Sequence, residues 1–260
     1  MININRNVAL TQLREMVEIN FSKKLNYMSE DFNTQQNEAL NMFKQRLYLE
    51  EVIDNTIAFN RSLKWNHESE YLHLTKTAED LVDVFKLRSD VYSNIGYQNE
   101  FPDTIEGMNF DLYDKDSAII YYKNNNKITG TIKVIFDNGN LLPSDEKFSF
   151  DYLRKDYKQI VELSRFIVSN EKKGLNLEFK YLFSGVYELF VQNDIDLIMS
   201  SLKEEHYKLY NKFGGTKIEA ELNAFGHLNL PAIVISWDPE KISNFFKKVF
   251  LNVKTNKLVA

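Results

Sequence analysis

The sequence predicts an α/β protein: one mixed β-sheet with helices on both faces, preceded by a helical extension at the N-terminus. Two observations lead to this class. Through the N-terminal quarter, apolar residues recur every three or four positions, which is the helical period. From Ser69 onward, short runs rich in β-branched and aromatic residues alternate with helical segments. We therefore expect a helical hairpin over residues 1–68 and a sheet-containing domain over residues 69–260.

The extension is expected to hold two helices, over residues 8–28 and 36–63, with the polar break 29–31 between them. In each helix the apolar side chains fall on one face. That face has to be covered, either by the following domain or by a partner protein.

The second part begins with a short strand over 70–74 and a helix that Thr77 caps. Strands over 117–123 and 127–136 form a hairpin, because the three asparagines between them tolerate the left-handed turn conformation. The remaining elements alternate and then end in a hairpin and a short helix: strand 160–168, helix 178–190, strand 195–202, helix 204–213, strands 217–222 and 232–237, and helix 242–250.

Composition excludes several functional classes. A hydrophobic fraction of 43% argues against disorder, and the absence of cysteine removes disulfides, thiolate catalysis and thiolate metal ligands, so we expect no metal site. A net charge of −5 argues against a nucleic-acid-binding protein. The first residues lack the apolar core of a signal peptide, and no stretch reaches the roughly 18 apolar residues of a membrane span. We expect a cytoplasmic protein without an integral membrane span.

Several segments, taken in order, resemble the GNAT superfamily, and more narrowly the acyl-homoserine-lactone (autoinducer) synthases and the long-chain N-acyl amino acid synthases. The run LVDVFKLRSDVY, with Arg88 and Tyr92, is similar to the family's first helix. The segment FDLYDKDSAIIYYK is similar to the acidic stretch before the central hairpin, and ELSRF at 162–166 reproduces a family strand. The segments EEHYKLYNKFGG and LNLPAIVISWD resemble the closing part of the amino acid synthases. This resemblance covers about 70–238 and implies a GNAT-like acyltransferase fold.

The resemblance implies an enzyme that transfers a long-chain acyl group to the amine of an amino acid or similar small molecule by direct attack on a thioester. It implies no permanently bound cofactor, an acyl-phosphopantetheine thioester as co-substrate, and acyl carrier protein as the partner that carries it, with acyl-CoA as the other possible donor. An acyl-homoserine-lactone synthase is one alternative, against which LNLPAIVISWD speaks. A catalytically idle binding or scaffold module is another, and the intact Glu162, Ser164, Arg165 and Tyr210 speak against it.

Catalysis is assigned to these same four residues. Glu162 is the candidate base, because burial in an apolar strand raises the proton affinity of a carboxylate; the alternative is that it is only paired with an arginine. Strand alternation places Glu162 and Ser164 on one face and Arg165 on the other, unless a bulge intervenes. Tyr210 stands where the family places the acid that protonates the thiolate, or else it only packs its helix on the sheet.

The donor and the acceptor have separate candidates. The resemblance places the pantetheine arm along the backbone of Phe166, Ile167 and Val168, where two parallel strands part. The loop that follows has one glycine and the acidic Glu171, which makes it a poor coenzyme A cradle and favours acyl carrier protein. Lys172, Lys173 and Gly174 in this loop are assigned to the donor, although a solvated loop explains them equally well. The acceptor is assigned two cations for its carboxylate, two acids for its amine and one aromatic residue, namely Arg88, Lys133, Asp111, Asp114 and Tyr92. Lys133 stands where the family more often has arginine.

Overall fold

A computed structural model describes residues 33–67, 69–139, 141–169, 176–226 and 230–251. The chain divides into two compact units, Met1–Leu49 and Glu50–Ala260. Helix α2 (Thr34–Ser62) passes through this division and agrees with the helix predicted over 36–63. The helix predicted over 8–28 lies outside the described residues, so the hairpin and its boundary at 68/69 stay predictions. None of the described helices is both long and apolar enough to cross a membrane.

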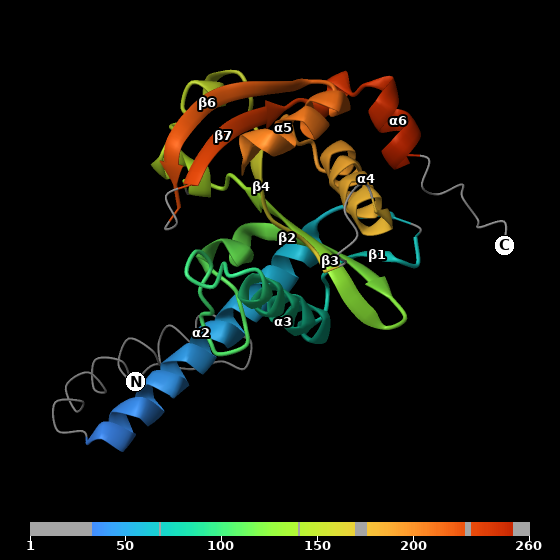
Figure 1. The fold of residues 1–260 in the computed structure, drawn as a ribbon. Coiled ribbons are helices and arrows are strands. Elements are labelled where there is room, and N and C mark those ends of the chain that lie inside the picture. The colour runs from blue at the N-terminus through green and yellow to red at the C-terminus, as the bar shows by residue number, and fades with distance from the viewer. Residues whose placement is uncertain (1–32, 68, 140, 170–175, 227–229, 252–260) are drawn as a thin grey trace, which may run out of the picture. The chain divides into compact units, whose positions relative to one another are not determined.

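The second unit is built on one seven-stranded mixed sheet with the strand order β1-β2-β3-β4-β5-β7-β6 (Figure 1). Neighbouring strands are antiparallel except for β4 and β5, which are parallel. The mixed sheet that the sequence predicts is therefore confirmed. The strands are β1 (Leu72–Leu74), β2 (Ser117–Asn124), β3 (Lys127–Phe136), β4 (Ile160–Val168), β5 (Leu197–Leu202), β6 (Thr216–Phe225) and β7 (Leu230–Trp237).

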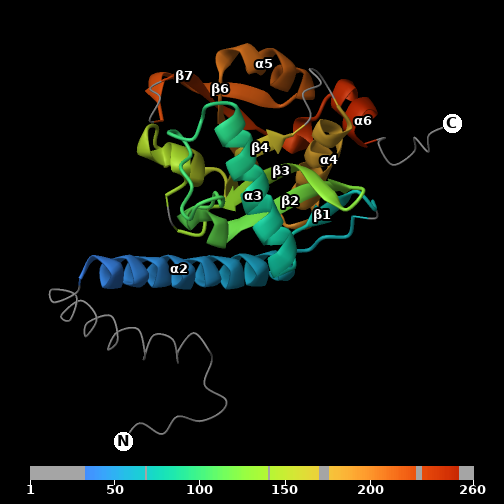
Figure 2. The same ribbon diagram turned by 60° about the horizontal axis from the view of Figure 1, so that its bottom comes forward.

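Helices α3 (Ala78–Asn94) and α4 (Leu177–Gln192) lie on opposite faces of this sheet (Figures 1 and 2). Helix α3 starts as predicted, since the Thr77 side chain accepts a hydrogen bond from the Asp80 amide. Helix α5 (Glu204–Tyr210) continues as a 3₁₀ turn and ends at Gly214, whose φ of 80° favours glycine. The chain then reaches the short helix α6 (Asn244–Phe250) after β7. Each of these helices was predicted from the sequence.

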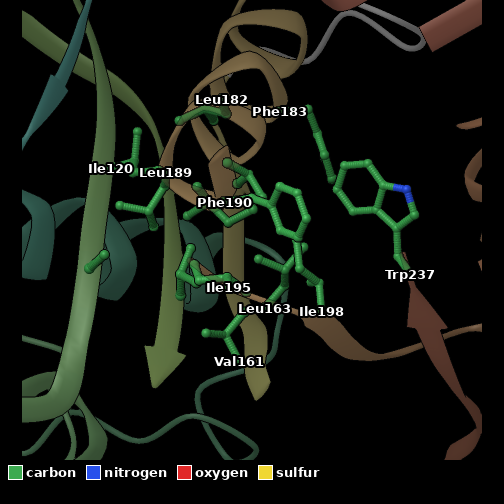
Figure 3. Packing of buried hydrophobic residues seen from close by; sticks show 14 of the residues in the cluster. Ile120, Val161, Leu163, Leu182, Phe183, Leu189, Phe190, Ile195, Ile198 and Trp237 are labelled. Atoms are coloured by element: carbon green, nitrogen blue, oxygen red, sulfur yellow. The ribbon is translucent and has the colours of Figure 1, made fainter. Parts of the chain in front are cut away.

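The main core lies between α4 and the sheet (Figure 3). Leu182, Phe183 and Leu189 of α4 are almost fully buried against side chains of β2, β4 and β5. The contributing strand residues alternate along each strand, as in β4, where Val161 and Leu163 both point to this side. At about 1.5–3 kcal/mol for each large apolar side chain removed from water, this layer holds α4 firmly on the sheet.

The opposite face of β3, β4 and β5 is covered by the connection between β3 and β4, residues 137–159. This connection contains two 3₁₀ helices, η3 (Pro143–Glu146) and η4 (Leu153–Lys155). Its apolar side chains Leu142, Phe150 and Leu153 pack on Ile160 and Met199. This segment, in which the sequence predicts no element and no site residue, covers the part of the sheet that holds Glu162.

Candidate active site

The site begins where strands β4 and β5 part. Their parallel pairing runs from Ile160 opposite Leu197 to Leu163 opposite Ser200 and ends there. Strand β4 continues to Val168, whereas β5 continues to Leu202 in pairing with β7. The backbone of β4 beyond Leu163 thus has no β5 partner in the described structure. This is the kind of opening that the sequence analysis expected beside residues 166–168.

The three residues of β4 that are assigned to the donor differ in their surroundings. The half-buried Phe166 lies against α4, with its ring centroid 5.2 Å from that of Phe179 and 5.5 Å from that of Phe183. Ile167 is buried and pairs across to Thr131, while Val168 is half-buried. The loop residues Lys172, Lys173 and Gly174 lie outside the described residues, so their role stays a prediction.

Glu162 is a buried carboxyl with one neighbour that hydrogen-bonds to both of its oxygens. The residue is 3% exposed. The Ser144 amide donates to Oε2 at 3.0 Å, and the Ser144 hydroxyl donates to Oε1 at 2.6 Å. Burial raises the pKa of Glu162 to about 7, although the hydrogen bonds from Ser144 and the charge of Lys133 oppose that rise. Among the described residues no arginine forms an ion pair with Glu162, which was the alternative to a catalytic role. A carboxyl with a pKa near 7 is suited to act as a general base.

Arg165 lies on the same face as Glu162 because β4 contains a bulge. Ser164 pairs with Lys133 but Ile167 pairs with Thr131, so Arg165 and Phe166 together stand opposite one residue of β3. Arg165 has a φ of 50°, in the left-handed region. The expectation from simple alternation, that Arg165 points away from Glu162, is therefore wrong. The structure instead contains the β-bulge that was the alternative to regular alternation.

Five of the predicted residues form one charged cluster on this face. Lys133 Nζ donates to both oxygens of Asp111, at 2.7 and 2.8 Å, and Arg165 Nη2 donates to Asp111 Oδ2 at 2.9 Å. Arg88 Nη1 donates to Asp114 Oδ1 at 2.8 Å, and Lys133 Nζ lies 3.5 Å from the same oxygen. Helix α3, the 3₁₀ helix η2 (Leu112–Asp116) with its N-cap Asp111, β3 and β4 contribute these side chains. Three cations stand against two carboxylates, which leaves an excess of one positive charge.

The pKa shifts in the cluster follow from this packing. Burial alone would raise the pKa of Asp111, but Lys133 and Arg165 outweigh it and hold that pKa well below its ordinary value. Burial lowers the pKa of Lys133, although Asp111 and Asp114 oppose the change. Asp111 is consequently ionised at neutral pH, and it organises the cations around it.

Two arginines of the cluster keep donors without a partner. Arg88 Nε and Nη2 and Arg165 Nη1 are buried and have no hydrogen-bond partner among the described residues. The Arg88 side chain is 0% exposed, whereas those of Arg165 and Asp111 are 12% and 24% exposed. A small molecule can therefore contact Arg165 and Asp111. Arg88 is buried and donates its hydrogen bond to Asp114.

Aromatic rings frame Arg165. Its guanidinium carbon lies 5.5 Å from the ring centroid of the buried Tyr92 and 4.1 Å from that of Phe101. Tyr92 is one of the predicted site residues, whereas Phe101 is not, because a single aromatic residue in a loop carries no motif. Ser144 is not among the predicted site residues either, because a single serine in a loop carries no motif.

Tyr210 and Ser164 are less defined by their contacts. The half-buried Tyr210 packs with its ring centroid 5.7 Å from Phe183 and 5.3 Å from Phe213, and burial raises its pKa above the ordinary value. It is thus protonated at neutral pH, and its role as the acid stays a prediction. Ser164 is half-buried on the face of Glu162.

Two surface hollows lie elsewhere and contain none of the predicted site residues. One, of about 420 Å³, is lined by residues of the 137–159 connection, including Asp137, Leu141, Asp151 and Arg154. The other, of about 730 Å³, surrounds the β2–β3 turn at residues 124–126. Neither hollow is lined by Glu162 or by a residue of the charged cluster.

Comparison with known proteins identifies the family and the fold. The family model described as N-acyl amino acid synthase FeeM matches residues 83–238. Among solved structures, the chain is similar to FeeM, an N-acyl amino acid synthase from uncultured soil microbes, with a TM-score of 0.53 and 17% identity over 70% of this chain and 96% of that one. It is also similar to the CoA-dependent acyl-homoserine lactone synthase BjaI, with a TM-score of 0.55 and 15% identity over 72% and 90%. No curated protein sequence matches. These likenesses confirm the GNAT-like acyltransferase fold.

Proposed function

The chain belongs to the N-acyl amino acid synthase FeeM family, and on that premise we propose that it transfers a long-chain acyl group from acyl carrier protein to the amine of an amino acid. The family and the acyltransferase class expected from the ELSRF segment and its neighbours are confirmed. The donor, the acceptor and the role of each residue are the proposal.

One observation carries this proposal: Glu162 is a carboxyl with a pKa of about 7, next to the point where β4 and β5 part. An amino acid arrives with its amine protonated, and only the neutral amine attacks a thioester. A base with a pKa near the working pH accepts that proton and can release it again. Backbone amides of β4 beyond Leu163, which have no β5 partner in the described structure, are suited to hold the thioester and stabilise its oxyanion.

The charged cluster supports an acceptor that carries a carboxylate. It holds three cations and two carboxylates, so it favours an anionic ligand once Glu162 is protonated. The Arg165 side chain is 12% exposed and its Nη2 donates to Asp111, so we assign the acceptor carboxylate to Arg165 and the orientation of this arginine to Asp111. Lys133 binds Asp111 with its ammonium group, and we give it a supporting role beside Asp114.

The experiment uses the full chain with acyl carrier protein thioesters and CoA thioesters of several lengths and a mixture of amino acids. Product is identified by mass spectrometry and thiol release is followed in parallel. We expect an N-acyl amino acid, formed faster from the carrier-protein donor, with turnover lowered about 10²- to 10⁴-fold in Glu162→Gln.

Three outcomes would contradict parts of this proposal. Absence of any acylated product from both donor classes, with folded protein, rejects the activity. An acyl-homoserine lactone formed from S-adenosylmethionine replaces the acceptor assignment by the alternative synthase. Full activity of Glu162→Gln removes Glu162 as the base while leaving the reaction class in place.

A further inference from the structure

We propose that the hydroxyl groups of Ser201 and Ser144 form a relay that carries a proton from the acceptor amine to Glu162. This inference rests on the proposed function, because it supplies the path for the proton that Glu162 accepts there. Neither serine belongs to a segment that resembles a family motif in the sequence analysis.

The relay consists of two short hydrogen bonds that share the Ser144 hydroxyl. Ser144 Oγ lies 2.6 Å from Glu162 Oε1 and 2.6 Å from Ser201 Oγ. A serine hydroxyl has one hydrogen, and Ser144 donates it to the Glu162 carboxylate. Ser201 must therefore donate to Ser144, so both hydroxyl hydrogens point along the chain of atoms toward Glu162.

The relay links a buried base to the opening between the strands. Glu162 is 3% exposed and Ser144 is 0% exposed. Ser201 is half-buried, and it directly follows Ser200, the last residue of β5 that pairs with β4. The turn that carries Ser144 covers Glu162, whereas Ser201 keeps partial exposure where the β4–β5 pairing ends, so an incoming amine would meet Ser201 first.

The turn that carries Ser144 is held by an ion pair. The neighbouring Asp145 accepts hydrogen bonds from the amides of Leu142 and Phe150, at 2.9 and 2.8 Å. Arg154 donates to both oxygens of Asp145, at 3.0 and 2.6 Å, and its Nε donates to Asp137 at 2.6 Å. This bidentate pair fixes the 137–159 connection, so the Ser144 hydroxyl is positioned before the substrate binds.

The proton balance of the step is simple. One N–H bond of the acceptor ammonium breaks as Ser201 Oγ takes the proton and passes its own to Ser144 Oγ. Ser144 passes its hydrogen to Glu162 Oε1, which becomes a carboxylic acid. Both hydroxyls are intact afterwards with their hydrogens reversed, and the neutral amine attacks the thioester carbonyl. The second amine proton leaves the adduct and goes to the departing thiolate sulfur.

The charged and titratable groups around Glu162 come from three elements. Lys133 of β3 lowers the pKa of Glu162 and Asp145 of η3 raises it. The charge of Glu162 contributes to a raised pKa of Tyr113 of η2, after burial of that tyrosine. The variant Ser201→Ala leaves these groups and both hydrogen bonds from Ser144 in place. It therefore interrupts the path without changing the base.

The test compares Ser201→Ala, Ser201→Thr and Ser144→Ala in the full chain, with Ser149→Ala as the control on the same connection. Ser149 is exposed, and its hydroxyl accepts only a local bond from the Asp151 amide. We expect Ser201→Ala to lower kcat about 10- to 100-fold with an unchanged KM for the thioester, and Ser201→Thr to restore it, since threonine keeps the hydroxyl.

Two further readouts separate a relay from a packing role. A plot of the wild-type rate against the D₂O fraction of the solvent should be curved, because several protons move together. The same plot for Ser201→Ala should be linear. The pH profile of kcat/KM should keep its midpoint in Ser201→Ala. In Ser144→Ala it should move to higher pH, because the Ser144 hydrogen bond lowers the pKa of Glu162.

Wild-type turnover in Ser201→Ala, together with a large loss in Glu162→Gln, would overturn the relay and mean that the amine reaches Glu162 directly. A defect in Ser201→Ala that threonine does not rescue would overturn it too, as a packing effect. Activity in both Ser201→Ala and Glu162→Gln would instead reject the base of the proposed function. The two failures are therefore distinguishable.

Discussion

At the scale of single residues, the proton affinity of Glu162 results from two opposed contributions. Burial favours the neutral acid, while Ser144 and Lys133 favour the carboxylate, and burial is the larger effect. A carboxyl held this way costs stability when it is ionised. Such a cost is typical of a group kept for chemistry rather than for folding.

This balance predicts how stability depends on pH. The pKa of Glu162 is about 7 in the folded chain against an ordinary value of 4.5, so the folded state binds the proton more tightly. The free energy of unfolding therefore falls as the pH rises from about 4.5 to 7, by about 3 kcal/mol for this group. Glu162→Gln should unfold at higher urea concentration than the wild type at pH 8, with little difference at pH 4.5.

Glu219→Gln provides the matched control for that measurement. Burial would raise the pKa of Glu219, but hydrogen bonds from Lys217, Ser236 and Tyr152 outweigh it and lower that pKa. Its ionised form therefore stabilises the fold, and Glu219→Gln should be less stable than the wild type at pH 8. If both variants lose stability at pH 8, the raised pKa of Glu162 is contradicted.

At the scale of elements, two features of the sheet build the site. The bulge in β4 turns Arg165 toward Asp111, and the end of pairing between β4 and β5 opens the backbone beside Glu162. Both depend on a sheet whose other face is held rigidly by α4. In that helix, Gly185 allows close approach to the sheet.

Gly185 predicts the effect of adding a side chain at this contact. A Cβ atom there would lie 2.8 Å from Leu72 Cδ2 and 3.1 Å from Trp65 Cη2. Gly185→Leu should lower the free energy of unfolding by about 2 kcal/mol through overpacking, despite the better helix propensity of leucine. Val191→Leu, at a position of α4 that is 57% exposed, is the control and should change little. Equal stability of the two variants in urea would contradict the close α4–sheet contact.

At the scale of the whole molecule, the C-terminal half of α2 belongs with the sheet. Thr56 Oγ donates to the Asp114 carbonyl at 3.0 Å, and Asn60 Nδ2 donates to the Ser117 carbonyl at 2.7 Å. The Ile119 amide donates to Asn60 Oδ1 at 2.9 Å. Both α2 residues are fully buried, so they support the segment that carries Asp114.

These contacts predict where the chain can be shortened. A chain of residues 50–260 should unfold cooperatively, because it keeps Thr56 and Asn60. A chain of residues 69–260 should unfold at much lower urea concentration or fail to fold, since removing these partners leaves buried carbonyls of η2 and β2 without donors. Circular dichroism in urea measures both. Equal stability of the two chains would place the functional boundary at 68/69, as the sequence alone suggests.

The α-helices and strands of the second unit, and the family, could be predicted from the sequence alone. Local patterns were sufficient there: Thr77 before an amphipathic run, three asparagines between two apolar runs, and ELSRF in a strand all act over a few neighbouring residues. Each matched an element in the structure, and the family assignment needed only their order along the chain.

The assembly of the site could not be predicted from the sequence, because it depends on contacts between distant segments. The left-handed conformation of Arg165 depends on its register against β3, and the cover of Glu162 depends on where the 137–159 connection packs. Ser144 and Ser201 lie 57 positions apart, and their hydroxyls meet only because two segments converge on one face of the sheet. Contacts of this range leave no periodic pattern in the sequence, because a serine in a loop looks the same whether or not a carboxylate lies beside it.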